Sequence, residues 1–435
     1  MRPALRSVAV ELIDICNLNC SYCLRDEDSL RGKAHALPVD RLRALLVDLN
    51  ALGEKGQLVF TGGEPTLHPD FSGILQTTAQ AGWKYVVVTN GWNFARVLPA
   101  LLNHRDHLSA VALSFDGQTR EAHDAFRGKG SFDRLMKAVA YCRLHELLFR
   151  VKMTVDRDKA RIVQELADYA ARLGAEALEL APLFPTNADS DARPMGVLEQ
   201  KRFLREIELL KKNLTMPIRL AAGFFMPTPE PTCGPLRGET LNVDYNGSLT
   251  LCSVLSGFRG QKNDRDRIAD LRSTSLVAAL AKLDTTIAEQ NERRRRDFEA
   301  LKRPADATLT LGSSCLHCLG SFGKLPVGFE AQKTKTTPRP DSYEATAGIV
   351  EVEGTGGARL LLDPLTQHVD TLNETAALVW TGVKEGASVD EIAQRLCAAF
   401  EISDAGARES VYATLLEFES RGLVQPRNAS ATAGA

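Results

Sequence analysis

Three cysteines within eight residues constrain this chain more than any other feature of its sequence. Cys16, Cys20 and Cys23 have the spacing C-x3-C-x2-C and lie at the end of an apolar run over residues 8–15 that alternates like a β-strand. A loop this short can direct three thiolates at one point. A complete four-iron cluster normally takes four cysteines, so three would leave one iron open to a substrate or cofactor. A zinc site is the alternative for cysteines this close together.

Length and composition are those of an ordinary globular protein. The 435 residues predict two or three domains, and the 44% hydrophobic and 25% charged fractions are typical. No apolar run reaches a membrane span, and Arg2 and Arg6 flank only a short mixed stretch rather than a signal peptide, so we expect a cytoplasmic protein without a membrane partner. In that reducing compartment nine cysteines favour metal over disulfides. A net charge of −2 argues against nucleic acid as the main partner.

Strand-like and helix-like segments alternate through the first part of the chain. Strands are expected at residues 7–15, 57–61, 84–89, 108–115, 149–155 and 177–183, and helices at 39–52, 131–147 and 158–173. Strands separated by helices form right-handed βαβ units and a parallel sheet. Polar motifs follow several of these strands, which is where chemistry gathers in barrels of such units. We predict a first domain over residues 1–215.

A glycine-rich motif connects the cysteine triad to a known family. Gly62-Gly63-Glu64-Pro65 follows the strand at 57–61, and Tyr22 directly precedes the third cysteine. Together these residues resemble the radical S-adenosylmethionine (radical SAM) superfamily. The resemblance implies an α/β fold with a partial (β/α)6 TIM barrel, and a SAM-binding [4Fe-4S] cluster held by the three cysteines. It also implies that one electron, from a donor such as flavodoxin or ferredoxin, cleaves SAM to a 5′-deoxyadenosyl radical that abstracts hydrogen from a substrate.

The same resemblance assigns SAM contacts to further residues. They are Tyr22, Gly62, Gly63, Glu64, Pro65, Asn90, Ser114, Asp116 and Arg127. The alternatives are a tight turn for the glycine pair, a simple turn around Asn90 and a solvated surface position for Arg127. Lys152 and Thr154 end the fifth strand and could face the barrel mouth. No residue stands out as a catalytic acid or base, and Cys142, in the middle of a helix, is expected in the core.

Four more cysteines lie between residues 230 and 320. Cys233 and Cys252 bracket a hairpin whose Asn246-Gly247 pair predicts a type I′ turn, and Cys315 and Cys318 form a C-x2-C pair. The C-x13-G-x4-C opening resembles the SPASM and twitch extensions of radical SAM enzymes, and the absence of further cysteines matches the smaller twitch type. That implies one auxiliary iron–sulfur cluster, of the [4Fe-4S] type, in a domain over residues 216–330 that relays electrons. Four-cysteine zinc is the alternative.

A basic run and a histidine accompany this second cysteine group. Arg293 to Arg296 fall in a helical pattern at 273–302. Acidic neighbours favour a solvated helix face over an anion-binding patch. His317 is interpreted as a filler of the loop rather than as a metal ligand.

A third domain follows a polar linker predicted at 331–342. Alternating runs at 348–353, 358–363 and 367–371 predict a three-stranded meander, and helices follow at 373–381, 388–400 and 405–422. With the phrase from Leu372 to Trp380, residues 343–425 resemble the peptide-chaperone family of pyrroloquinoline quinone biosynthesis. Such α+β, winged-helix-like modules are RiPP recognition elements, RiPPs being ribosomally made and post-translationally modified peptides. The resemblance implies a precursor's leader peptide bound as an added strand, which we expect along His368 to Thr371. Residues 426–435 are predicted to be a disordered tail.

The charge of the third domain argues against a winged-helix DNA-binding domain, which has a similar set of strands and helices. Residues 348–425 carry 13 Asp or Glu and 5 Lys or Arg, a balance of −8. DNA binding needs a basic face, whereas an acidic module suits a leader peptide carrying Lys or Arg.

The sequence therefore predicts a radical SAM enzyme that modifies a precursor peptide by crosslinking or oxidation, with the leader held by the C-terminal domain. The alternative is a radical SAM oxidase or mutase of a free small molecule. A non-catalytic peptide-delivery or DNA-binding protein, with clusters as sensors, is a third interpretation, against which the complete Gly62–Pro65 motif argues.

Overall fold

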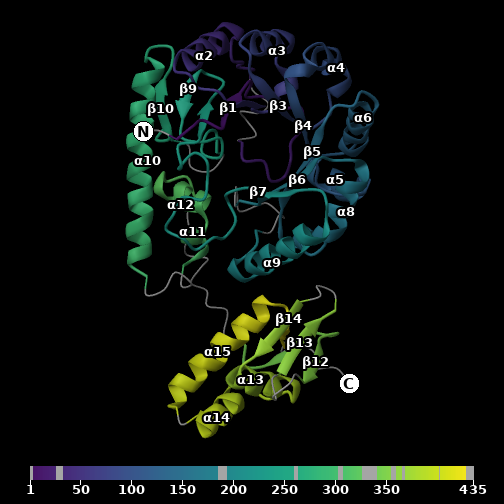
Figure 1. Cartoon of the computed structure of the whole chain (residues 1–435), viewed down its shortest axis with the longest axis vertical. Coiled ribbons are helices and arrows are strands. Elements are labelled where there is room, and N and C mark those ends of the chain that lie inside the picture. Colours follow the sequence, from purple (N-terminus) through teal and green to yellow (C-terminus); the bar gives the residue numbers. More distant parts are fainter. Residues whose placement is uncertain are drawn as a thin grey trace. The chain divides into compact units, whose positions relative to one another are not determined.

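The structure, a computed structural model, describes most of the chain as two compact units (Figure 1). The described residues are 3–25, 33–184, 194–258, 263–301, 307–325, 340–353, 359–364, 368–400 and 402–427. One unit comprises residues 1–195 and 214–327, and the other comprises residues 196–213 and 328–435. Among the described residues, no helix is both long and apolar enough to cross a bilayer.

In the described part of the chain, a ten-stranded sheet organises the first unit, in the order β10-β9-β8-β1-β2-β3-β4-β5-β6-β7. Strands β8 and β1 to β7 run parallel, whereas β9 and β10 pair antiparallel. The strands are β1 (Ser7–Glu11), β2 (Gln57–Thr61), β3 (Lys84–Thr89), β4 (Leu108–Ser114), β5 (Phe149–Val155), β6 (Ala177–Pro182), β7 (Ile218–Leu220), β8 (Thr240–Val243), β9 (Ser248–Thr250) and β10 (Arg267–Asp270). All six strands predicted for the first domain are present.

Helices lie on the outer side of this curved sheet (Figure 1). They are α2 (Val39–Ala51), α3 (Phe71–Gln80), α4 (Phe94–Asn103), α5 (Arg120–Arg127), α6 (Ser131–Leu144), α7 (Arg157–Ala160) and α8 (Val163–Leu173), with short 3-10 turns η1 (Pro65–Leu67) and η2 (Arg105–His107). Leu42, Leu45, Leu46 and Leu49 of α2 are buried, as their helical spacing predicts. The predicted α/β fold with a partial barrel is confirmed.

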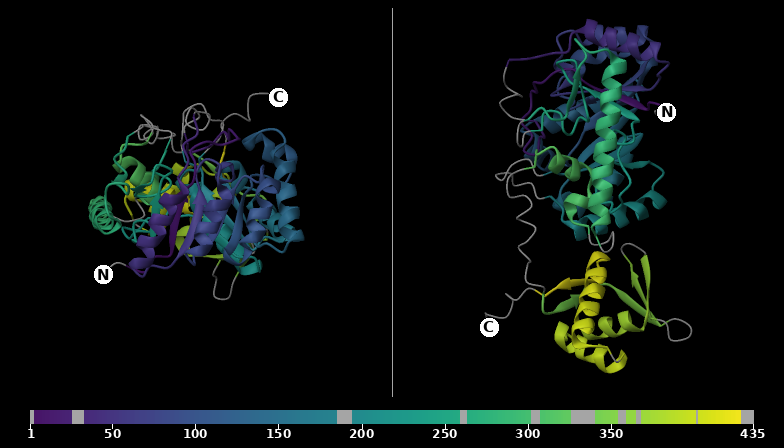
Figure 2. Two further views of the ribbon diagram at one scale, coloured as in Figure 1. Left: turned by 90° about the horizontal axis from the view of Figure 1, so that it is seen from above. Right: turned by 90° about the vertical axis from the view of Figure 1, so that its left-hand side faces the viewer.

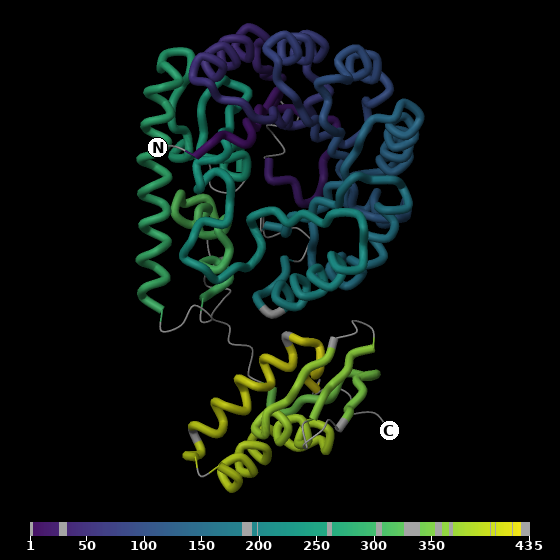
Figure 3. Tube along the Cα trace, in the orientation of Figure 1, coloured from purple at the N-terminus to yellow at the C-terminus, as the bar shows by residue number. Residues whose placement is uncertain are grey.

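Strand β1 ends at Glu11 and is therefore shorter than the strand predicted over residues 7–15. The chain beyond it bonds to two different segments: Leu12 N donates to Thr61 O at 2.8 Å, and Leu37 N donates to Leu12 O at 2.9 Å. From there the segment runs inside the arc of strands, where it is purple in Figure 3.

The segment between Cys233 and Cys252 joins the same sheet. Strand β8 pairs in parallel with β1, with Ser7 to Val10 opposite Thr240 to Val243. The predicted hairpin of β8 and β9 is present, but its turn is not of type I′, since only Gly247 of the Asn-Gly pair has a positive φ (+80°). The Asp244 carboxylate accepts from the N–H groups of Asn246 and Ser248 at 2.9 and 2.8 Å, which stabilises a longer turn.

In the described residues, three later helices belong to the first unit. They are α10 (Leu276–Glu299), α11 (Leu309–Gly312) and α12 (Ser314–Ser321). Helix α10 runs along one side of the unit as a single long helix (Figure 2). Residues 216–327 thus belong to one compact unit with the barrel, and the domain boundary expected at 215 stays a prediction.

The described residues of the second unit form two small antiparallel sheets and a set of helices. Strands β12 (Val350–Glu353), β13 (Arg359–Asp363) and β14 (His368–Leu372) form the predicted meander, in that order. The predicted helices are α13 (Glu374–Lys384), α14 (Val389–Phe400) and α15 (Asp404–Ser420), and α9 (Val197–Asn213) belongs to the same unit. A further pair, β11 (Tyr343–Ala345) with β15 (Val424–Pro426), was not predicted. Residues 331–339 of the expected linker and 428–435 of the expected tail lie outside the described residues.

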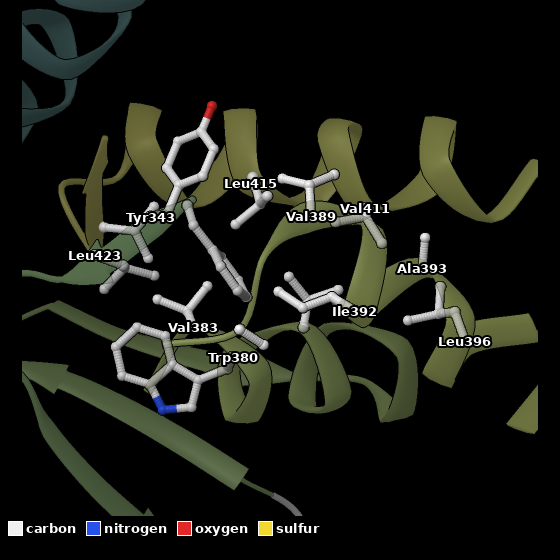
Figure 4. Packing of buried hydrophobic residues seen from close by; sticks show 14 of the residues in the cluster. Tyr343, Trp380, Val383, Val389, Ile392, Ala393, Leu396, Val411, Leu415 and Leu423 are labelled. Atoms are coloured by element: carbon white, nitrogen blue, oxygen red, sulfur yellow. The ribbon is translucent and has the colours of Figure 1, made fainter. Parts of the chain in front are cut away.

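Residues 343–424 supply a hydrophobic core of their own (Figure 4). The Trp380 ring packs edge-on against Phe418, with centroids 5.9 Å apart, and its Nε1 donates to Glu351 at 3.2 Å. Val383, Ile392 and Leu415 belong to the same cluster. Because these side chains come from all three helices, the core fixes the helices against one another and against the strands.

Candidate functional site

The glycine pair after β2 fixes the path of the chain into the first cysteine. Gly63 N donates to Ile13 O at 2.7 Å, and Glu64 N donates to Ile15 O at 2.9 Å. A Cβ atom on Gly62 would lie 2.4 Å from Ile13 O, and one on Gly63 would lie 1.9 Å from Ile15 O. No side chain fits in either place, so the motif brings two backbones together one residue before Cys16.

We therefore expect Gly63→Ala to weaken the first cysteine site. The new Cβ would push the Ile15 carbonyl away, and such overpacking costs about 1–3 kcal/mol. Urea unfolding measures that loss, and iron content after reconstitution shows whether the cysteine loop still binds. Gly196→Ala is the matched control, because its φ is not positive and its Cβ would make only an ordinary contact, at 3.6 Å, with Glu199 Oε2. An equal loss of iron in both variants would contradict this account.

The three thiols of the first group lie in one electrostatic environment. Burial raises the pKa of Cys16 to about 12 and that of Cys20 to about 11, and the neighbouring thiols contribute to both shifts. Polar hydrogens face two of the sulfurs: Asn90 Nδ2 lies 3.8 Å from Cys16 Sγ, and Arg127 Nη1 lies 3.9 Å from Cys20 Sγ. Leu18 N also donates to Cys16 Sγ, at 3.5 Å.

The polar hydrogens that face the sulfurs, rather than a preformed metal-binding geometry, are the feature that favours an iron–sulfur cluster here. Thiolates of these clusters commonly accept hydrogen bonds, which also tune the cluster. Across the residues that the structure describes, no three His, Cys, Asp or Glu side chains form a group that could hold a metal ion.

A buried group of four polar side chains lies next to Cys20. Asp116 Oδ2 accepts from Arg127 Nε at 2.6 Å and from the Tyr22 hydroxyl, and Asp116 Oδ1 accepts from Lys159 Nζ at 2.8 Å. Arg127 Nη2 donates to the Tyr22 oxygen at 2.7 Å. Burial alone would raise the pKa of Asp116, but the Arg127 and Lys159 cations hold it below its ordinary value. The group therefore holds one carboxylate between two cations.

These contacts exclude the surface alternative for Arg127 and add Lys159 to the site. Arg127 is 9% exposed, so it is not the solvated surface arginine considered above. Lys159 was not predicted; it lies on α7, four residues after the end of β5, and its Nζ also donates to Thr154 O at 2.9 Å and lies 3.8 Å from the centre of the Phe126 ring. The signal available in the sequence was its position shortly after the C-terminal end of β5. Lys152 is exposed, whereas the carbonyl of Thr154 belongs to the site.

Glu64 connects the ends of two strands. Its buried carboxylate accepts from Thr66 N and the Thr66 hydroxyl at 3.2 and 2.6 Å, from the Thr89 hydroxyl at 2.7 Å and from Asn90 N at 2.8 Å. Asn90 in turn donates to Asn17 Oδ1 at 2.9 Å. Glu64 thus positions Asn90 beside the cysteine loop. Pro65 begins η1 and Ser114 ends β4, which places both at the same edge of the sheet.

The other four cysteines converge from three segments. Cys233 precedes β8, Cys252 follows β9, and Cys315 and Cys318 lie on α12. Burial raises the pKa of all four thiols, that of Cys252 to about 12, and the charges of Cys233, Cys252 and Cys318 raise the pKa of Cys315 further. The four thiols therefore lie near enough for their charges to act on one another, although the described residues form no group of three that could hold a metal ion.

One prediction about the surroundings of this group holds only in part, and another is wrong. Arg294 is fully buried, whereas its neighbours Arg293, Arg295 and Arg296 are exposed, so the basic run is not a uniformly solvated face. His317 is 7% exposed and its Nε2 lies 2.8 Å from Asp297 Oδ2. It connects α12 to α10 instead of merely filling a loop.

The two cysteine groups are joined through the segment that follows Cys23. Arg25 forms an isolated β-bridge with Phe258, six residues after Cys252. Its Nη2 donates to Glu11 Oε2 at 2.6 Å, and Glu11 Oε1 accepts from Asn242 Nδ2 of β8 at 3.2 Å. One hydrogen-bonded frame therefore supports both groups.

Comparison with known proteins bears on both units. Residues 10–176 match the radical SAM superfamily, and residues 359–424 match coenzyme PQQ synthesis protein D (PqqD). An AdoMet-dependent heme synthase of Methanosarcina barkeri (strain Fusaro / DSM 804) is 27% identical over 220 residues, which cover 50% of this chain and 62% of that protein. The antilisterial bacteriocin subtilosin biosynthesis protein AlbA of Bacillus subtilis (strain 168) is 31% identical over 170 residues, covering 38% of this chain and 37% of that protein.

The fold is shared with a solved structure as well. Streptococcus suis SuiB bound to precursor peptide SuiA has a TM-score of 0.54 at 12% identity, over 76% of this chain and 74% of that chain. The chain spans 50–62% of the length of the first curated relatives it matches. A GTP 3′,8-cyclase of Stenotrophomonas maltophilia (strain K279a) is 33% identical over 273 residues, covering 58% of this chain and 73% of that protein. With these matches to the barrel and its cysteine loop, the chain belongs to the radical SAM superfamily and carries a PqqD-type domain in addition.

Proposed function

We propose that this protein is a radical SAM maturase, which modifies a ribosomally made precursor peptide while its PqqD-type domain holds the leader. The barrel alone does not select a substrate, because relatives matched along it include a heme synthase, a GTP cyclase and a bacteriocin biosynthesis protein. The PqqD-type domain in the same chain is the observation that favours a peptide. Tethering a leader raises the effective concentration of the segment to be modified.

Membership of the superfamily implies SAM and a [4Fe-4S] cluster, and the first cysteine group fits both. Cys16, Cys20 and Cys23 would hold the cluster, with Asn90 and Arg127 directing polar hydrogens at the sulfurs. When bound, SAM and the cluster supply a radical that abstracts hydrogen from the substrate. Tyr22 and Asp116 hold the Arg127 guanidinium in one orientation, and Lys159 holds Asp116, which pre-organises a cation beside Cys20. A flavodoxin or ferredoxin would deliver the electron.

The second cysteine group would hold one auxiliary [4Fe-4S] cluster of the twitch type. Cys233, Cys252, Cys315 and Cys318 supply four thiolates, a complete ligand set for such a cluster. A cluster ligated in this way has no open iron for substrate, so its role would be to relay an electron during a net oxidation or crosslink. Zinc satisfies the same four thiolates, and analysis of iron, sulfide and zinc in the purified protein separates the two.

An open strand edge is the structural basis for leader binding. Among the described strands, β14 ends the sheet, and its Val369 side chain is 52% exposed. The neighbouring Asp370 is buried and pairs with Arg421, which holds the edge against the end of α15. An added peptide strand would bond to the main chain of β14, which supplies affinity with little dependence on leader sequence.

We expect Val369→Pro to weaken leader binding at least about tenfold, because proline removes a backbone donor from the edge strand and about 1.4 kcal/mol corresponds to a tenfold change. Fluorescence polarisation of the full-length protein with short peptides encoded beside its gene measures the effect. Val352→Pro is the matched control, since Val352 is 43% exposed on β12 at the opposite edge. Equal losses in both variants, with both still folded by circular dichroism, would contradict an edge at β14.

Failure to bind any neighbouring peptide would reject the peptide substrate itself. If the reduced protein still cleaved SAM in that case, the remaining candidate would be an oxidase or mutase of a free small molecule.

A further inference from the structure

Arg294 is a buried cation that the proposed reaction does not use. Its side chain is 0% exposed. Nε and Nη2 donate to Thr228 O at 3.1 and 2.9 Å, Nη1 donates to Leu311 O at 2.6 Å, and Nη2 lies 3.5 Å from Met226 O. Its guanidinium carbon lies 4.9 Å from the centre of the Phe298 ring, which shields it from water.

None of the hydrogen bonds that the described residues make to Arg294 comes from a carboxylate. Carbonyl oxygens satisfy its N–H groups but carry no net charge, and a buried charge without a counter-charge is costly. Asp297 is the carboxylate that acts on it electrostatically, but its side chain is 49% exposed and lies against His317. The other groups that act on its charge are the thiols of Cys318, Cys233 and Cys315.

The hydrogen bonds of Arg294 reach the two segments that carry those thiols. Met226 and Thr228 precede Cys233 by seven and five residues in one loop. Leu311 lies in α11, four residues before Cys315. A single side chain on α10 thus connects both cysteine-bearing segments, and its positive charge acts on the thiols that they carry.

We propose that Arg294 is the charge-compensating positioning residue of the auxiliary site, a proposal that rests on the auxiliary cluster proposed above. Its guanidinium offsets the negative charge of the thiolates of Cys233, Cys315 and Cys318 and, by favouring the more negative reduced cluster, raises the reduction potential. Reduction adds one electron to the cluster and no proton. The added negative charge is therefore not neutralised by protonation, and it interacts with the Arg294 guanidinium. A tenfold change in the ratio of reduced to oxidised cluster at fixed potential corresponds to 59 mV for one electron.

The test isolates the auxiliary cluster in the full-length chain. Replacing Cys16, Cys20 and Cys23 with alanine leaves the second cysteine group alone to bind iron. In that background, Arg294→Met, Arg294→Lys and Arg295→Met are compared by redox titration followed by electron paramagnetic resonance. Arg295 is the matched control, because it is the next residue of the same helix, exposed and paired with Glu292.

We expect Arg294→Met to lower the reduced-to-oxidised ratio at fixed potential at least tenfold, Arg294→Lys to retain most of it, and Arg295→Met to leave it unchanged. A loaded Arg294→Met protein with an unchanged potential would overturn the proposal. If that variant lost its cluster, Arg294→Lys would decide: loading at the original potential supports charge compensation, and loss of loading in the lysine variant too would overturn it.

Metal analysis of the parent protein separates this proposal from the proposed auxiliary cluster. Zinc in place of iron would reject the cluster but not the role of Arg294, because zinc bound by four thiolates is also an anion. In that case the time that a chelator needs to remove the zinc should fall at least tenfold in Arg294→Met and stay unchanged in Arg295→Met. Equal removal times in the two variants would overturn the role of Arg294.

Discussion

The Cys20→Ala variant should lose SAM cleavage completely and bind about four irons fewer than the parent protein, because a four-iron cluster with two protein ligands is not retained. Iron and sulfide analysis after anaerobic reconstitution, with chromatographic detection of 5′-deoxyadenosine, measures both effects. The remaining iron, about four atoms, should stay with Cys233, Cys252, Cys315 and Cys318. This is the largest effect that the structure predicts, since it removes the chemistry altogether.

Cys142→Ala is the control for that experiment. Cys142 is fully buried on α6, and burial raises the pKa of its thiol to about 12. Its replacement should cost packing alone and should leave both iron content and SAM cleavage in place. Full iron in Cys20→Ala, or an equal loss in Cys142→Ala, would contradict the assignment of the first cysteine group.

The second large effect concerns stability. Asp116→Asn should lower the free energy of unfolding by about 3–5 kcal/mol, because it leaves Arg127 and Lys159 buried without their shared negative partner. Both cations lie within 2.8 Å of the Asp116 oxygens, and the asparagine has nearly the same shape. Urea unfolding of the protein without SAM measures the change, free of any contribution from ligand binding.

Asp133→Asn provides the comparison on the surface. Asp133 pairs with Arg120 at 2.6 Å, but both side chains are more than half exposed. Such pairs contribute about 0–1 kcal/mol, so the control should unfold nearly as the parent does. Similar unfolding midpoints for the two variants would show that the buried group does not carry the stability assigned to it.

The periodicity of apolar residues was sufficient to predict most of the strands and helices. The strands of the barrel are apolar runs, and α2 has a leucine stripe, so their periodicity predicts them. The meander and three helices of the C-terminal domain were predicted for the same reason. The short pair β11 and β15 was missed because strands of three residues show no alternation, and their partners lie about eighty residues apart.

Charged residues were judged by their sequence neighbours, and that is where prediction failed. Arg294 lies among exposed arginines, yet its acceptors at Thr228 and Met226 are 66 and 68 residues away. Lys159 pairs with Asp116 across 43 residues. Burial of a charge is decided by such distant partners, which no window of sequence contains. The first cysteine group could be predicted because its spacing is local, and the second because its Cys233–Cys252 opening and C-x2-C pair resemble a known pattern.

The pairing of β1 with β8 has a consequence for the order in which the chain is made. Ser7 meets Thr240 across 233 residues of sequence. At about 5–20 residues per second, roughly 10–50 s pass on the ribosome between the synthesis of β1 and that of its second neighbour. During that interval one edge of β1 stays open, and open edges invite wrong pairing. A nascent chain of this protein therefore carries its first cysteine loop on an unfinished sheet. Iron that bound during this interval would bind to a site before the residues that later support it have been synthesised.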